Sequence, residues 1–135
     1  RFPHAWEAAP FTARRMSPLL GRLLFAGGLV ALAVRNLTNL EGRIAYADAK
    51  GLPAADQLVP AASGLLLGGS LGIGAWKLPK LSAGSVAAFF IGVTPVMHNF
   101  WAVDSEARDE ELTSFLQNLT LLGAAIVFLK RATKE

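Results

Sequence analysis

The sequence predicts an all-α fold, a transmembrane four-helix bundle with a short extracytoplasmic helix or loop between its first and second spanning helices. Composition is the first reason, because 53% of the 135 residues are hydrophobic and only 17% are charged. The second reason is the spacing of the charges, which leaves uncharged runs of 20, 23 and 18 residues at 57–76, 81–103 and 112–129. Each run is close to the ~20 residues that cross a hydrocarbon core as a helix, and about twice the length of a barrel strand.

The first span, residues 16–40, is interrupted by Arg22 and Arg35, with 12 uncharged residues between them. This segment crosses a membrane only if both arginines lie near its ends. Arg22 can extend its guanidinium to the headgroups along its apolar stem, whereas Arg35 is harder to explain.

The longest connection follows the first span, and its residues 41–50 could form two or three helical turns. The sequence Gly51-Leu52-Pro53 is typical of a helix stop. Because Ile44 and Tyr46 are apolar, we expect this helix to lie across the mouth of the bundle and cover the spans.

Lysine and arginine accumulate on one side of the predicted bundle. They occur in the N-terminal arm (residues 1–15), between the second and third spans, and in the basic tail (130–135), whereas the turn 104–111 is mostly acidic. Since basic loops stay in the cytoplasm, we place both termini there, in a cell membrane. Trp6 and its apolar neighbours suggest that the arm rests on the inner surface. The net charge of +3 is therefore a topology signal, and no nucleic-acid partner is expected.

Small residues spaced four apart indicate helix packing, because they let backbones approach closely. Two explanations stay open, which are close packing within the monomer and an interface with a second copy or a larger complex. The predicted packing residues are Gly64, Gly68, Gly72, Gly84 and Gly92.

Cysteine is absent, which excludes disulfides and thiolate-held iron–sulfur clusters within this chain. The only histidines are His4 and His98, on opposite sides of the predicted bilayer, so one copy cannot build a bis-histidine haem site. We find no phosphate loop, zinc motif or nucleophile triad, and predict neither a catalytic constellation nor a metal site.

Several motifs together resemble the DoxX family of small four-helix membrane proteins, related to DoxD-type subunits of thiosulfate:quinone oxidoreductase. The motifs are Gly21-Arg22-Leu23-Leu24-Phe25, Gly51-Leu52-Pro53, the Gly68-Gly69 pair with Gly72 and Gly74, His98-Asn99-Phe100-Trp101, and Phe115-Leu116-Gln117-Asn118-Leu119 with Leu122-Gly123. The chain departs from the family pattern at Leu65, where a glutamate is common, and at Asn99, where an aspartate is frequent. The loss of two carboxylates argues for binding rather than acid–base catalysis.

Polar residues fall in the outer half of every predicted span. At a rise of ~1.5 Å per residue, Arg35 and His98 lie roughly 10 and 9 Å from their span centres, and Asn118 roughly 5 Å. One interpretation is structural, with these side chains hydrogen-bonding between helices. The other is a pocket that binds a quinone headgroup, a lipid headgroup or a small anion, lined by Arg35, His98, Asn99, Trp101 and Asn118.

The resemblance implies an accessory membrane subunit of a respiratory or redox complex, with quinone as the cofactor to consider. The alternative is the membrane subunit of a thiosulfate:quinone oxidoreductase-type enzyme. In either case the expected partners are membrane lipids and other membrane subunits or a homo-oligomer.

Overall fold

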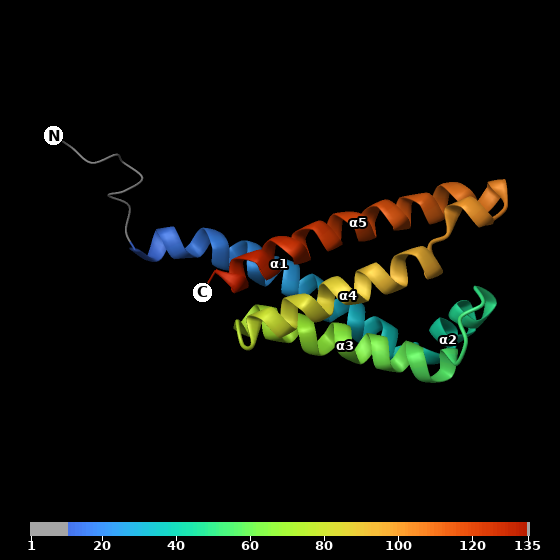
Figure 1. Cartoon of the computed structure of the whole chain (residues 1–135), viewed down its shortest axis with the longest axis horizontal. Helices are drawn as coiled ribbons and strands as arrows, with labels where there is room; N and C mark the ends of the chain where they lie inside the picture. Colours follow the sequence, from blue (N-terminus) through green and yellow to red (C-terminus); the bar gives the residue numbers. More distant parts are fainter. Residues whose placement is uncertain (1–10, 135) are drawn as a thin grey trace.

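A computed structural model describes residues 11–134, and every element in it is helical (Figure 1). Four helices in this part of the chain are long and apolar enough to span a membrane, which confirms the predicted fold class. They are α1 (Phe11–Thr38), α3 (Ala55–Ala75), α4 (Pro79–Met97, continued by the 3-10 turn η1 at Phe100–Ala102) and α5 (Ser105–Thr133), and the short α2 (Leu40–Ala49) links the first two. Most of the predicted N-terminal arm, residues 1–10, lies outside the described residues.

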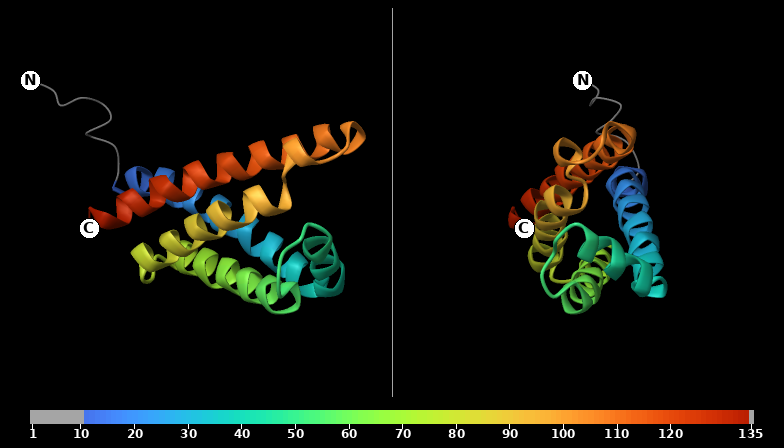
Figure 2. Two further views of the ribbon diagram at one scale, coloured as in Figure 1. Left: turned by 45° about the vertical axis from the view of Figure 1, so that its right-hand side comes forward. Right: turned by 90° about the vertical axis from the view of Figure 1, so that its right-hand side faces the viewer.

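The spanning helices pack in the order α1, α3, α4 and α5, and α2 lies against the start of α3. Figures 1 and 2 show the start of α1, the turn between α3 and α4, and the end of α5 at one end of the bundle. We name this the basic end, because the charged residues there whose side chains the structure describes are Arg22, Lys77, Lys80, Lys130, Arg131 and Lys134. The helix α2 and the connection between α4 and α5 lie at the opposite end.

The core between the helices is narrow and contains many small side chains. Its fully enclosed members include Leu29, Leu66, Ile73 and Val86, each at most 2% exposed. Large apolar side chains remain exposed on the outward faces, as at Leu24 and Val127. Such a surface suits lipid, where helices associate by close packing rather than by burial from water.

The helix α2 confirms the prediction for residues 41–50. It ends in a Schellman motif, in which the Leu52 amide donates to the Ala47 carbonyl and the Gly51 amide to the Asp48 carbonyl, at 3.1 and 2.9 Å. Gly51 has φ +86°, a left-handed conformation that favours glycine.

The run 81–103, expected as one span, is not one continuous helix. Pro95 lies inside α4 and has no amide to donate to the Ile91 carbonyl, and the helix ends two residues later at Met97. His98 therefore occupies the C-cap, where its backbone φ of −126° is no longer helical. This break turns the chain toward α5 at the residues that the sequence singled out.

The glycines that pack helices together differ from the predicted set. A Cβ placed on Gly64, Gly68, Gly84 or Gly92 would meet no atom within 4 Å, so these four do not mediate close packing within the monomer. Of the predicted glycines, only Gly72 mediates close packing within the monomer. Gly69, which is not in the predicted set, lies in the same contact, because a Cβ on it would lie 3.0 Å from the Ser82 carbonyl oxygen. For these four glycines, the alternative of an interface with a second copy or a larger complex stays a prediction.

Candidate functional site

A polar cluster joins α2, α4 and α5 at the end opposite the basic end. Its centre is the Glu111 carboxylate, two turns into α5 and 13% exposed. The Tyr46 hydroxyl of α2 lies within hydrogen-bond distance of this carboxylate and of the Met97 carbonyl oxygen, the latter at 3.0 Å. One phenol therefore ties α2 to both α4 and α5.

Two nitrogen donors face the other oxygen of the same carboxylate. Lys50 Nζ is 3.5 Å and His98 Nδ1 is 3.3 Å from Glu111 Oε2. The Lys50 ammonium also donates to Asn99 Oδ1 at 2.8 Å. These five residues, Tyr46, Lys50, His98, Asn99 and Glu111, are called the Glu111 network below.

The protonation of Tyr46 follows from its surroundings. Burial raises the pKa of the Tyr46 phenol above its ordinary value, and the hydrogen bond to Glu111 and the negative charges of Glu111 and Glu110 act in the same direction. Tyr46 therefore stays a hydrogen-bond donor to the carboxylate. Lys50 Nζ lies 5.3 Å from the centre of the Tyr46 ring and places its charge beside both groups.

Aromatic rings lie directly beside the network. Phe100 packs edge-to-face on Trp101 and on Phe115, each at a centroid distance of 5.2 Å, and Trp101 lies 5.9 Å from Phe115. Trp101 is 56% exposed, so one ring of this aromatic cluster is accessible from outside the bundle. The break after Met97 positions these rings, because η1 carries both Phe100 and Trp101.

The structure brings together three of the five residues predicted from the sequence. His98 and Asn99 belong to the network and Trp101 belongs to the adjacent cluster. Arg35 is exposed near the end of α1, and Asn118 lies two turns beyond Glu111 along α5. In the described part of the chain, neither side chain has a hydrogen bond or ion pair with the network.

Tyr46, Lys50 and Glu111 complete the network and were not among the predicted site residues. Tyr46 was assigned only to the membrane boundary, and Glu111 only to an acidic turn. The position of Glu111 immediately before the last apolar run was the one available signal, since a carboxylate there lies at a membrane boundary. The structure also supplies a carboxylate beside His98, although the sequence lacks the ones expected at Leu65 and Asn99.

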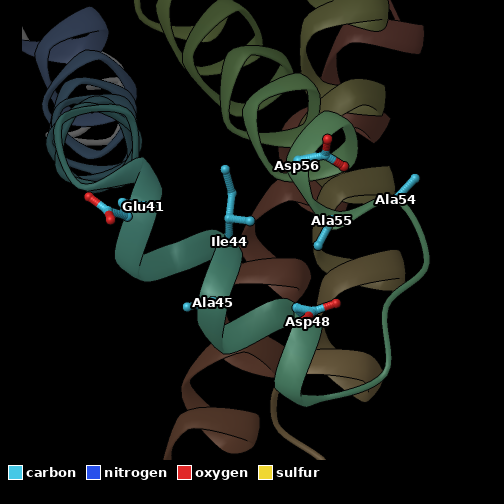
Figure 3. A pocket seen from close by; sticks show the side chains of 7 residues that line it. All are labelled: Glu41, Ile44, Ala45, Asp48, Ala54, Ala55 and Asp56. Atoms are coloured by element: carbon cyan, nitrogen blue, oxygen red, sulfur yellow. The ribbon is translucent and has the colours of Figure 1, made fainter.

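A separate open hollow of about 350 Å³ lies between α2 and the start of α3 (Figure 3). Its lining includes the acidic side chains Glu41, Asp48 and Asp56, and none of the predicted site residues. Within the described residues, no group of three His, Cys, Asp or Glu side chains could hold a metal ion.

Comparison with protein families gives one match, in which the DoxX family model covers residues 17–99. The matched region runs from α1 to the C-cap of α4, so it includes His98 and Asn99, whereas Glu111 and the aromatic cluster lie beyond it. No curated protein and no solved structure matches the chain. The family model covers more than half of the chain, including three of its four helices long and apolar enough to span a membrane, and the chain therefore belongs to the DoxX family.

Proposed function

We propose that this DoxX-family membrane protein is an accessory subunit of a redox complex and binds a quinone headgroup beside the Glu111 network. The observation that carries the proposal is the contact of His98 and Lys50 with one carboxylate, next to three mutually packed aromatic rings. Both features lie at one end of the spanning helices, and a membrane-soluble quinone could present its headgroup at such an end.

The chemistry of the residues suits such a ligand. A quinone headgroup is a flat ring with carbonyl oxygens that accept hydrogen bonds. Lys50 and His98 are donors for those oxygens, and the exposed face of Trp101 is a surface on which the ring can stack.

Proton exchange is the second function that the network can support. Histidine is the side chain that most readily exchanges protons near neutral pH, and His98 Nδ1 lies 3.3 Å from a Glu111 carboxylate oxygen. Reduction of a quinone consumes two electrons and two protons. His98 and Glu111 would hold and move the protons, and we assign the electrons to a partner subunit, because the chain has no cysteine for an iron–sulfur cluster or thiol chemistry.

A direct test uses the purified full chain in lipid nanodiscs and a short-chain quinone as the probe. Affinity is measured from quenching of tryptophan fluorescence. The His98→Ala variant should bind about tenfold more weakly, which corresponds to the loss of one hydrogen bond involving a charged group. His4→Ala is the matched control, because it removes the only other imidazole of the chain and keeps the Glu111 network. Equal affinity in the two variants would refute the proposal.

The carboxylate beside His98 also favours a second candidate, the membrane subunit of a thiosulfate:quinone oxidoreductase-type enzyme. Glu111 and His98 form an acid–base pair of the kind that quinone reduction needs. Thiosulfate-dependent quinone reduction by this chain with one small soluble partner would support this candidate. Co-purification with haem or flavin subunits in mild detergent would support the accessory role.

A further inference from the structure

We propose that Arg22 and Trp76, at the basic end, bind the phosphate of an anionic phospholipid in the adjacent leaflet. The site lies at the end of the bundle opposite the Glu111 network, and the proposal is independent of the proposed quinone binding.

The first observation is an arginine without an acceptor. Arg22 is only partly exposed, and its Nε is closed off from solvent with no hydrogen-bond partner among the described residues. A buried donor without a partner costs about 1–3 kcal/mol, and more when it is charged. The exposed part of the guanidinium can take an acceptor from outside this part of the chain.

The second observation is the aromatic surface that holds the guanidinium. Arg22 Cζ lies 5.4 Å from the centre of the Trp76 ring, within the range of a cation–π contact. Trp76 packs against Phe128 of α5 at 6.5 Å, and Phe128 packs against Phe25 of α1 at 5.1 Å. Three helices thus fix the position of the Arg22 head.

The backbone of Trp76 supports the same interpretation. Trp76 caps α3 with φ +55°, in the left-handed region that favours glycine. A large side chain in that conformation persists only where its surroundings hold it, and such positions often have a functional reason. Tryptophan also prefers the headgroup level of a bilayer, which places Arg22 at the depth of lipid phosphates.

The third observation is the sign of the surrounding charge. Among the described residues, the charged side chains at the basic end are all lysines or arginines, and the carboxylates lie toward the opposite end. No described carboxylate can therefore neutralise Arg22. A phosphate fits, because the planar guanidinium binds its oxygens through two parallel hydrogen bonds and the lysines attract negatively charged lipids.

Lipid contact can be measured at Trp76 alone. The chain has three tryptophans, and replacing Trp6 and Trp101 with phenylalanine leaves Trp76 as the only indole. The full chain is placed in phosphatidylcholine nanodiscs that contain equal mole fractions of brominated phosphatidylglycerol or brominated phosphatidylcholine. Bromine quenches a tryptophan that it contacts. We expect about fivefold enrichment of phosphatidylglycerol at Trp76.

The Arg22→Gln variant should abolish the enrichment, whereas Lys134→Gln removes one positive charge from the same end and should retain most of it. If Arg22→Gln does not fold, Arg22→Lys is the test, since it keeps the charge and loses the planar group, and we expect weaker enrichment. Equal quenching by the two lipids, or enrichment unchanged on replacement of Arg22, overturns the proposal. Release of the lipid by inorganic phosphate overturns it too, because the site would then bind free anions.

Discussion

The two ends of this bundle neutralise their charges in different ways. At the Glu111 network, three donors from α2 and α4 surround one carboxylate of α5, so the charges are neutralised within the chain. At the basic end, close backbone packing and aromatic rings hold the helices, and the described charged residues are all positive. Both ends are polar, but only at the Glu111 network are the charges neutralised by other residues of the chain.

This difference separates the two roles that we propose for the protein. An internally neutralised network can bind an uncharged ligand, and its titratable side chains can respond to pH. An end with uncompensated positive charge instead favours anionic lipids and one orientation in the membrane. We therefore expect ligand-dependent behaviour at the Glu111 network and anchoring at the basic end.

The largest effect on stability should come from removing the centre of the network. Glu111→Ala leaves Tyr46, Lys50 and His98 without their shared acceptor, and should lower the free energy of unfolding by about 2–3 kcal/mol. Partial exposure keeps this value below the cost of breaking a fully buried ion pair. Unfolding in a denaturing detergent gives the measurement.

Glu110→Ala is the matched control for this variant. Glu110 is exposed, and its removal should change the free energy of unfolding by less than about 0.5 kcal/mol. If both variants lower the free energy of unfolding equally, the contacts of Glu111 in the network add nothing to stability beyond what any acidic residue of this turn contributes.

A smaller effect is expected from disturbing the packing toward the basic end. A Cβ on Gly72 would lie 2.7 Å from Ser82 Cβ, so Gly72→Ala should cost about 1–2 kcal/mol by overpacking the contact between α3 and α4. Gly68→Ala, one turn earlier, meets no atom within 4 Å and should be neutral or slightly stabilising. The comparison fails if both variants unfold alike in the same detergent titration.

The architecture could be predicted from the sequence because it depends on local properties. Runs of apolar residues predicted four spans, and Gly51-Leu52-Pro53 predicted the end of α2. The helix α5 begins at Ser105, before the predicted span 112–129. The acidic residues from Glu106 onward in fact continue the helix, where negative charge near the N-terminus is favourable.

The candidate site could be predicted only in part, because its members are distant in the sequence. Tyr46 and Glu111 are 65 positions apart, and nothing near either residue indicates the other. His98 and Asn99 were found because polar groups at the end of an apolar run are costly wherever the chain folds. Arg35 has nearly the predicted depth of His98, and Asn118 lies in the same half of the predicted bundle, but contact also depends on helix order and rotation, which a depth calculation does not contain.

The smallest effect, and the most specific to the network, is the ionisation of Tyr46. This residue is the only tyrosine of the chain, so the ultraviolet absorbance of phenolate reports on it alone. Burial and the contact with Glu111 raise its pKa above the ordinary value of about 10. In the folded protein, absorbance should therefore remain low at about pH 11, where the phenol of the unfolded chain is mostly ionised.

The sign of the accompanying stability change follows from the raised pKa. Below about pH 10 the phenol is protonated in both states, and its contribution to stability is fully present. Above that value the unfolded chain loses its proton first, so stability falls as the pH rises toward the pKa of folded Tyr46. Lysine side chains ordinarily lose their protons in this pH range as well, so the phenolate absorbance is a more selective signal than stability. Glu111→Gln should shift the absorbance midpoint toward its ordinary value, and identical titration curves for the folded and unfolded chain would show that Tyr46 is not held by the network.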